Sequence, residues 1–114
     1  MNRHKIVISE PAEADIDAIR FRLMSHSPDA AVRFQNGIEN VIDSLSQMPK
    51  RCAVAQDNDR LERPSRQLIY RSGAASYRIL FAVFDEQDDI PCFVRILRIR
   101  HGSQQSLLAP ADEE

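Results

Sequence analysis

Two apolar runs that contain arginines, both in the last third of the chain, constrain the fold more than any other feature. Residues 76–84 and 92–100 are rich in β-branched and aromatic side chains, which is typical of strands buried on at least one face. The acidic segment between them, 85–91, predicts a turn. Because burying an unpaired guanidinium is costly, we expect the arginines of these runs to lie on a surface that uses positive charge.

Two helices are predicted in the first half of the chain. Each begins with a serine that can cap the helix, Ser9 or Ser27, followed by a proline suited to the first turn. Apolar positions at spacings of three and four extend the helices over 11–24 and 28–48. The short link between them predicts a helical hairpin.

The remaining segments complete an α+β fold. Strands are predicted at 4–9 and 67–71, and 49–65 reads as an exposed loop. The resulting order is β-α-α-β-β-β, a four-stranded and mainly antiparallel sheet with the helical hairpin packed on one face and the other face open. We expect one domain over 1–102 and a tail over 103–114.

Charge, cysteine pattern and hydropathy argue against a generally basic nucleic-acid binder, a metal or redox protein and a membrane protein. The net charge is −2, but 60–101 holds eight arginines against five acids, so a local basic face is compatible with an acidic chain. Cys52 and Cys92 form no metal-binding or redox pattern, and we expect neither a metal site nor a cofactor. A signal peptide and a membrane-length apolar run are both lacking, so a cytoplasmic protein with no membrane partner is expected.

Five short patterns occur in a fixed order over roughly residues 5–102. They are Ser9-Glu10-Pro11-Ala12-Glu13-Ala14-Asp15, Ser27-Pro28-Asp29-Ala30-Ala31-x-x-Phe34, Ile42-x-x-Leu45-x-x-Met48-Pro49, Tyr77-Arg78-Ile79-Leu80-Phe81 and Val94-x-x-Leu97-Arg98-x-Arg100-His101-Gly102. Together they resemble the RelE/ParE superfamily of bacterial toxins from type II toxin–antitoxin systems, which includes plasmid stabilization proteins.

The resemblance implies a growth-inhibiting toxin that a cognate antitoxin neutralises. ParE-like members bind DNA gyrase, whereas RelE-like members cut mRNA on the ribosome and carry lysines in their second strand. This chain has Gln67, Leu68 and Ile69 there, which favours the ParE-like function. The alternatives are a ribosome-dependent mRNA endoribonuclease and a non-toxic remnant that still binds antitoxin. A dimer, or a hetero-oligomer with antitoxin, is compatible with each.

Under the ribonuclease alternative the resemblance implies a metal-independent enzyme that uses Arg78 and His101. Arg78 would hold phosphate charge, and His101 would act as acid or base near neutral pH. Each has a structural alternative: Arg78 could pair with Asp85 or Glu62, and a histidine before a glycine is often structural. Glu62, Asp85 and Glu86 are the acidic candidates for a base, with no spacing that singles one out.

Four arginines are predicted to bind the target. These are Arg71, Arg78, Arg98 and Arg100, of which the last two should share a face of their strand, with Arg95 on the opposite face. Salt bridges to the acidic helices, or a solvated strand edge, explain the strand-four arginines equally well.

Overall fold

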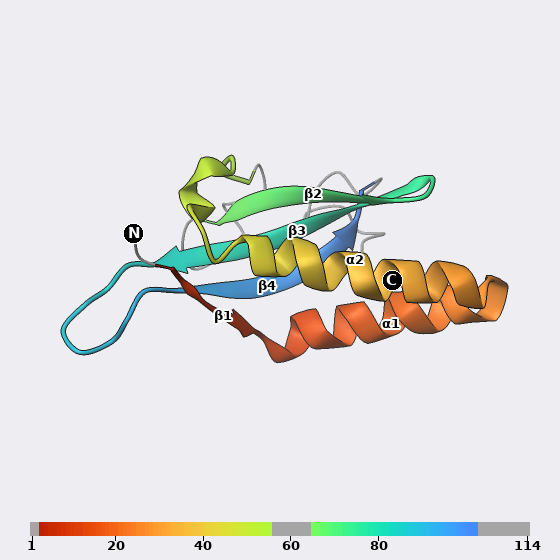
Figure 1. Ribbon diagram of the computed structural model, residues 1–114, viewed down its shortest axis with the longest axis horizontal. Coiled ribbons are helices and arrows are strands. Elements are labelled where there is room, and N and C mark those ends of the chain that lie inside the picture. The colour runs from red at the N-terminus through yellow and green to blue at the C-terminus, as the bar shows by residue number, and fades with distance from the viewer. Residues whose placement is uncertain (1–2, 56–64, 103–114) are drawn as a thin grey trace, which may run out of the picture.

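The computed structural model describes residues 3–55 and 65–102, and it confirms the predicted element order (Figure 1). Two helices form a hairpin beside a four-stranded sheet, with a short 3₁₀ turn between the two parts. The elements are β1 (Lys5–Ile8), α1 (Glu10–His26), α2 (Pro28–Ser44), the 3₁₀ turn η1 (Pro49–Arg51), β2 (Arg66–Ser72), β3 (Ala75–Phe84) and β4 (Phe93–His101).

The strand order in the sheet is β1-β4-β3-β2. The last three strands are antiparallel to their neighbours, as their short connections require, and Gly73 adopts a positive φ of 62° in the turn between β2 and β3. Strand β1 is parallel to β4 and pairs only with residues 93–96 of it. The other half of that edge of β4 therefore has no neighbouring strand in the described ranges.

Both helices begin where their sequences predict. The Ser9 hydroxyl accepts a hydrogen bond from the Ala12 amide, and the Ser27 hydroxyl accepts one from the Ala30 amide, each at 3.2 Å. Helix α1 runs two residues further than expected, to His26.

The predicted end of the second helix, at residue 48, is wrong by four residues. The Leu45 amide bonds to the Ile42 carbonyl in a tightened last turn, and Met48 adopts the left-handed conformation with a φ of 49°. The Arg51 guanidinium then donates to the carbonyl of Gln47 at 2.7 Å. Periodicity misplaced the boundary because Leu45 is buried from the turn rather than from the helix.

The core lies between the hairpin and one face of the sheet. Phe34 of α2 packs edge-on against Tyr77 of β3, with ring centroids 5.1 Å apart, and Tyr70 of β2 stacks at 6.3 Å from Tyr77. The other fully buried large side chains of this cluster include Ile38, Leu45, Ile79, Phe81, Val94 and Ile96.

Part of the predicted loop over 49–65 is structured. It contains the 3₁₀ turn, and Val54 forms a bridge with Arg66 at the start of β2. The loop candidate Glu62 and the predicted tail over 103–114 lie outside the described residues.

Candidate functional site

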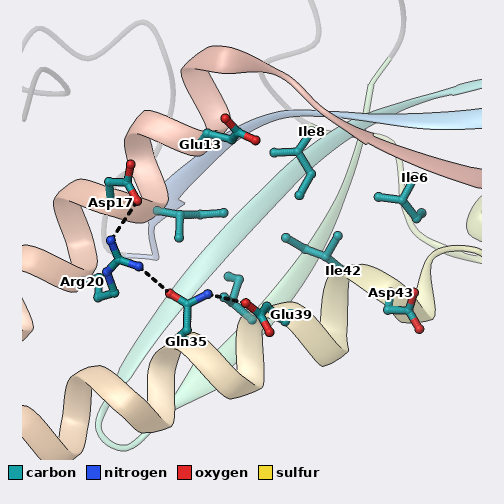
Figure 2. A pocket seen from close by; sticks show the side chains of 11 residues that line it. Ile6, Ile8, Glu13, Asp17, Arg20, Gln35, Glu39, Ile42 and Asp43 are labelled. Atoms are coloured by element: carbon teal, nitrogen blue, oxygen red, sulfur yellow. Dashed lines mark hydrogen bonds and ion pairs between the residues drawn. The ribbon is translucent and has the colours of Figure 1, made fainter.

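A groove opens between the two helices where they meet strand β1, and its floor is apolar (Figure 2). Strand periodicity places Ile6 and Ile8 on one face of β1, and helical periodicity places Ile38 and Ile42 on one side of α2. With Ile16 of α1, these residues line a volume of about 460 Å³. Ile8 remains 37% exposed. An apolar floor of this size, next to a sheet edge, is a candidate surface for an apolar segment of a partner.

Polar side chains form the rim of the groove. The Arg20 guanidinium pairs with Asp17 on its own helix and donates to the Gln35 side chain of α2, at 3.2 Å in both cases. Gln35 in turn donates to the Glu39 carboxylate. This chain of contacts crosses from α1 to α2 at one end of the groove (Figure 2). At the other end of the groove, near Ile6, the carboxylate of Asp43 forms the rim.

A second candidate surface is the sheet face that points away from the hairpin. Residues directly opposite each other in antiparallel strands share a face. Arg78 lies opposite Arg100, and Leu80 opposite Arg98. On the other side of β3, Ser76 lies opposite Arg71 of β2. The four arginines predicted to bind the target therefore belong to one sheet face.

The prediction that Arg95 points to the other face is wrong. Arg95 lies opposite Ala82, so it shares the face of Arg78 and Leu80. The register between β3 and β4 shifts after Leu80, and Leu97 is left as the extra residue of a bulge. A bulge reverses the alternation of side chains on the strand that carries it, which strict period-two counting cannot anticipate.

The centre of this face is buried, whereas we expected it to be open. Arg78 is 7% exposed, and Leu80 and Ala82 have no exposed surface. Exposed side chains of this face lie toward its margins, at Ile69 and Arg71 of β2 and at Arg95 of β4. Leu80 and Ala82 lie two and four residues after Arg78 in β3, so apolar side chains adjoin its guanidinium stem on this face.

Arg98 has a partner on helix α1. Its Nε and Nη2 atoms donate to the two carboxylate oxygens of Asp15 at 2.8 and 3.0 Å. The same carboxylate accepts a hydrogen bond from the Ile99 amide at 2.8 Å. Asp15 therefore occupies the half of the β4 edge that β1 does not reach. This contact of Arg98 is the salt bridge to an acidic helix that the sequence offered as an alternative to target binding.

His101 lies on the helix side of the sheet. It stands opposite Tyr77, and the two rings meet edge-on with centroids 5.5 Å apart. Arg78 follows Tyr77 directly in β3 and so belongs to the other face. The two residues of the ribonuclease alternative are thus separated by the sheet.

Asp85, an acidic candidate of the same alternative, pairs with Lys50 at 2.9 Å, and this hydrogen bond lowers the pKa of the Asp85 carboxyl.

The described ranges contain no group of three or more His, Cys, Asp or Glu side chains placed to hold a metal ion. Burial raises the pKa of the Cys52 thiol, which keeps it in its unreactive protonated form. Among the helices of the described residues, none has the length and apolar content needed to cross a membrane.

Sequence reasoning missed the groove and the role of Asp15. The groove residues come from three elements, and the acids of its rim read as ordinary solvated helix faces. In the sequence, Asp15 is one of several charged residues on the polar side of the first helix and has no pattern that sets it apart. The available signal was the acid-rich α1 sequence itself, which has Glu13, Asp15 and Asp17 at alternate positions.

Comparison with known proteins identifies the family. The model of the family described as "ParE toxin of type II toxin-antitoxin system, parDE" matches residues 6–106. A solved structure titled "Chromosomal ParDE TA system from P. aeruginosa" shares the fold, with a TM-score of 0.58 and 21% identity, over 85% of this chain and 94% of that one. No curated protein sequence matches the chain. The chain belongs to the ParE toxin family of type II toxin–antitoxin systems.

Proposed function

We propose that this toxin acts in the cytoplasm by binding DNA gyrase, and that a cognate antitoxin holds it inactive by filling the groove between α1, α2 and β1. The antitoxin part rests on the groove itself: Ile38 and Ile42 form a buried base, but Ile8 is 37% exposed and Ile6 and Ile16 are partly exposed, and such an apolar surface calls for a covering segment. Segments that fold on binding often cover such surfaces.

Action by binding rather than by cleavage is supported by the positions of Arg78 and His101. Cleavage through a ribose hydroxyl needs a proton-transfer group within hydrogen-bond reach of a phosphate that a cation holds. These two side chains belong to opposite faces of the sheet, and Arg78 is almost fully buried. The register therefore counts against a joint active site built from them.

The purified toxin should be incubated with gyrase, ATP and relaxed plasmid, and in parallel with ribosomes translating a labelled mRNA. We expect loss of supercoiling and intact mRNA. Cleaved mRNA with normal supercoiling would replace the proposal by the ribonuclease alternative. A chain that leaves both reactions and cell growth unaffected would be the non-toxic remnant.

The antitoxin part needs a separate experiment. Co-expression with the product of the neighbouring short reading frame should restore growth and yield a stable complex. Ile8→Gln replaces an exposed part of the groove floor and should weaken that complex. A complex of unchanged stability would place the antitoxin elsewhere on the toxin.

A further inference from the structure

The groove carries an uncompensated negative charge along its rim. Four carboxylates and one guanidinium line it, and the guanidinium, Arg20, is engaged by Asp17. The other three carboxylates, Glu13, Glu39 and Asp43, have no cation within 4 Å in the described ranges. Glu13 projects from α1, whereas Glu39 and Asp43 project from α2, so both sides of the apolar floor are acidic (Figure 2).

The one cation among the described residues that line the groove, Arg20, lies at one end of it, in the network that joins the two helices. Across the gap between α1 and α2 the Arg20 guanidinium donates to the Gln35 side-chain oxygen, and its other contact is with Asp17 of its own helix. The floor beyond this network, toward Ile6 and Ile8, is flanked by the carboxylates that lack a cation. A segment lying on this floor must therefore pass between acidic side chains on both sides.

We propose that the segment filling this groove is an amphipathic helix with apolar side chains on one face and Lys or Arg at the flanking positions, selected by Glu13, Glu39 and Asp43. This inference rests on the proposed antitoxin and specifies its chemistry. A helix fits because its residues at i, i+3, i+4 and i+7 form one apolar stripe, which matches the apolar floor that β1, α1 and α2 build around the exposed Ile8.

The carboxylates of the rim act mainly by discriminating between segments with basic and acidic flanks. An acidic flank would be brought beside Glu39 and Asp43 as the groove loses water, and such like-charge contacts are unfavourable in interfaces. A basic flank would neutralise them. Since the rim is solvent-exposed, the preference should weaken as salt screens these charges.

A displayed library of helical peptides tests the proposal. All members share an apolar stripe, and their flanking positions encode Lys, Gln or Glu equally. Selection on the purified toxin should enrich lysine at the flanks. A selected peptide should bind roughly 10-fold more tightly than its Lys→Glu counterpart, and the ratio should fall at high salt. Enrichment of Glu, absence of any charge preference, or absence of enrichment above a blank surface would overturn the proposal.

Three variants assign the preference to the groove. Combining Glu39→Lys with Asp43→Lys should shift the enriched flanks from Lys to Glu. Glu86→Lys, the same kind of charge reversal at one exposed position in the turn between β3 and β4, should leave the lysine preference intact. Ile8→Gln should weaken every selected peptide, whatever its flanks. An unchanged preference in the double variant would place the selected peptides outside this groove and contradict the proposal.

Growth inhibition by the wild-type toxin is scored separately. A toxin that fails to inhibit growth or gyrase contradicts the proposed function, yet its groove still reports a flank preference. Conversely, an active toxin that selects peptides without regard to charge leaves the proposed function standing and removes only this inference.

Discussion

Arg78 and His101 lie on opposite faces of the sheet, although both come from the adjacent strands β3 and β4. His101 stands opposite Tyr77, whereas Arg78 stands opposite Arg100. The one-residue offset decides the geometry, because successive residues of a strand point to opposite sides. A reaction that required both side chains at one phosphate would need the end of β4 to rotate.

We predict that His101→Ala leaves growth inhibition within about 2-fold of the parent toxin. A general acid or base contributes roughly 10²- to 10⁴-fold to a rate, so a nuclease relying on His101 would lose nearly all toxicity. Viable counts after induction of matched amounts of protein provide the measurement. A 100-fold or greater loss in a folded His101→Ala protein would revive the ribonuclease alternative.

Asp15→Ala is predicted to lower the free energy of unfolding by about 2 to 3 kcal/mol, since it removes the carboxylate that accepts from the Arg98 guanidinium and from the Ile99 amide. The Asp15 side chain is 13% exposed. Asp17→Ala is the matched control, because its pair with Arg20 is exposed and should contribute less than about 1 kcal/mol. Urea unfolding measures both.

Hydrogen exchange separates the two roles of Asp15. The Ile99 amide should exchange faster in Asp15→Ala, while Arg98→Ala should affect that amide less because its acceptor remains. Equal stability losses for the Asp15 and Asp17 variants would mean that the edge of β4 does not depend on Asp15.

Local patterns predicted the elements well because the signals that form them are local. Ser9 and Ser27 cap the helices at the expected residues, and the arginine-bearing runs form adjacent strands. The same reasoning failed at Arg95, where the bulge at Leu97 depends on how β4 registers with β3. Pairing between strands is a tertiary property, so the periodicity of one strand does not reveal it.

The candidate site was less accessible to sequence reasoning. The groove floor joins β1 to α2, so Ile6 and Ile42 become neighbours only when the hairpin packs on the sheet. Each isoleucine had an adequate explanation as a core residue. The contact between Arg98 and Asp15 joins residues 83 positions apart in the chain, so the pattern of neither segment alone predicts it.

Gly37→Ala is predicted to destabilise the protein by about 1 to 3 kcal/mol, although alanine is the better helix former by about 1 kcal/mol. A Cβ at position 37 would lie 1.9 Å from the Tyr70 hydroxyl oxygen and 2.7 Å from the ring carbon that bears it. Thermal unfolding measures the loss. Combining the change with Tyr70→Phe should recover part of it, because the nearest clashing atom is removed. A stabilising Gly37→Ala would show that helix propensity outweighs this contact.

The stability of the fold should fall at alkaline pH through Tyr77. Burial raises the pKa of its hydroxyl, and the neighbouring Arg22 offsets part of that rise. A group whose pKa is higher in the folded state stabilises the fold fully at pH values below its unfolded pKa, which is about 10 for tyrosine. This stabilisation is lost as the pH rises through the folded pKa. We therefore expect the free energy of unfolding to decrease above about pH 10.

Urea unfolding across this range should show a shallower decrease for Tyr77→Phe and a steeper one for Arg22→Ala. The slope is the readout, because either change can also shift stability at neutral pH. An alkaline slope that is identical in Tyr77→Phe and the parent would assign the effect to another group.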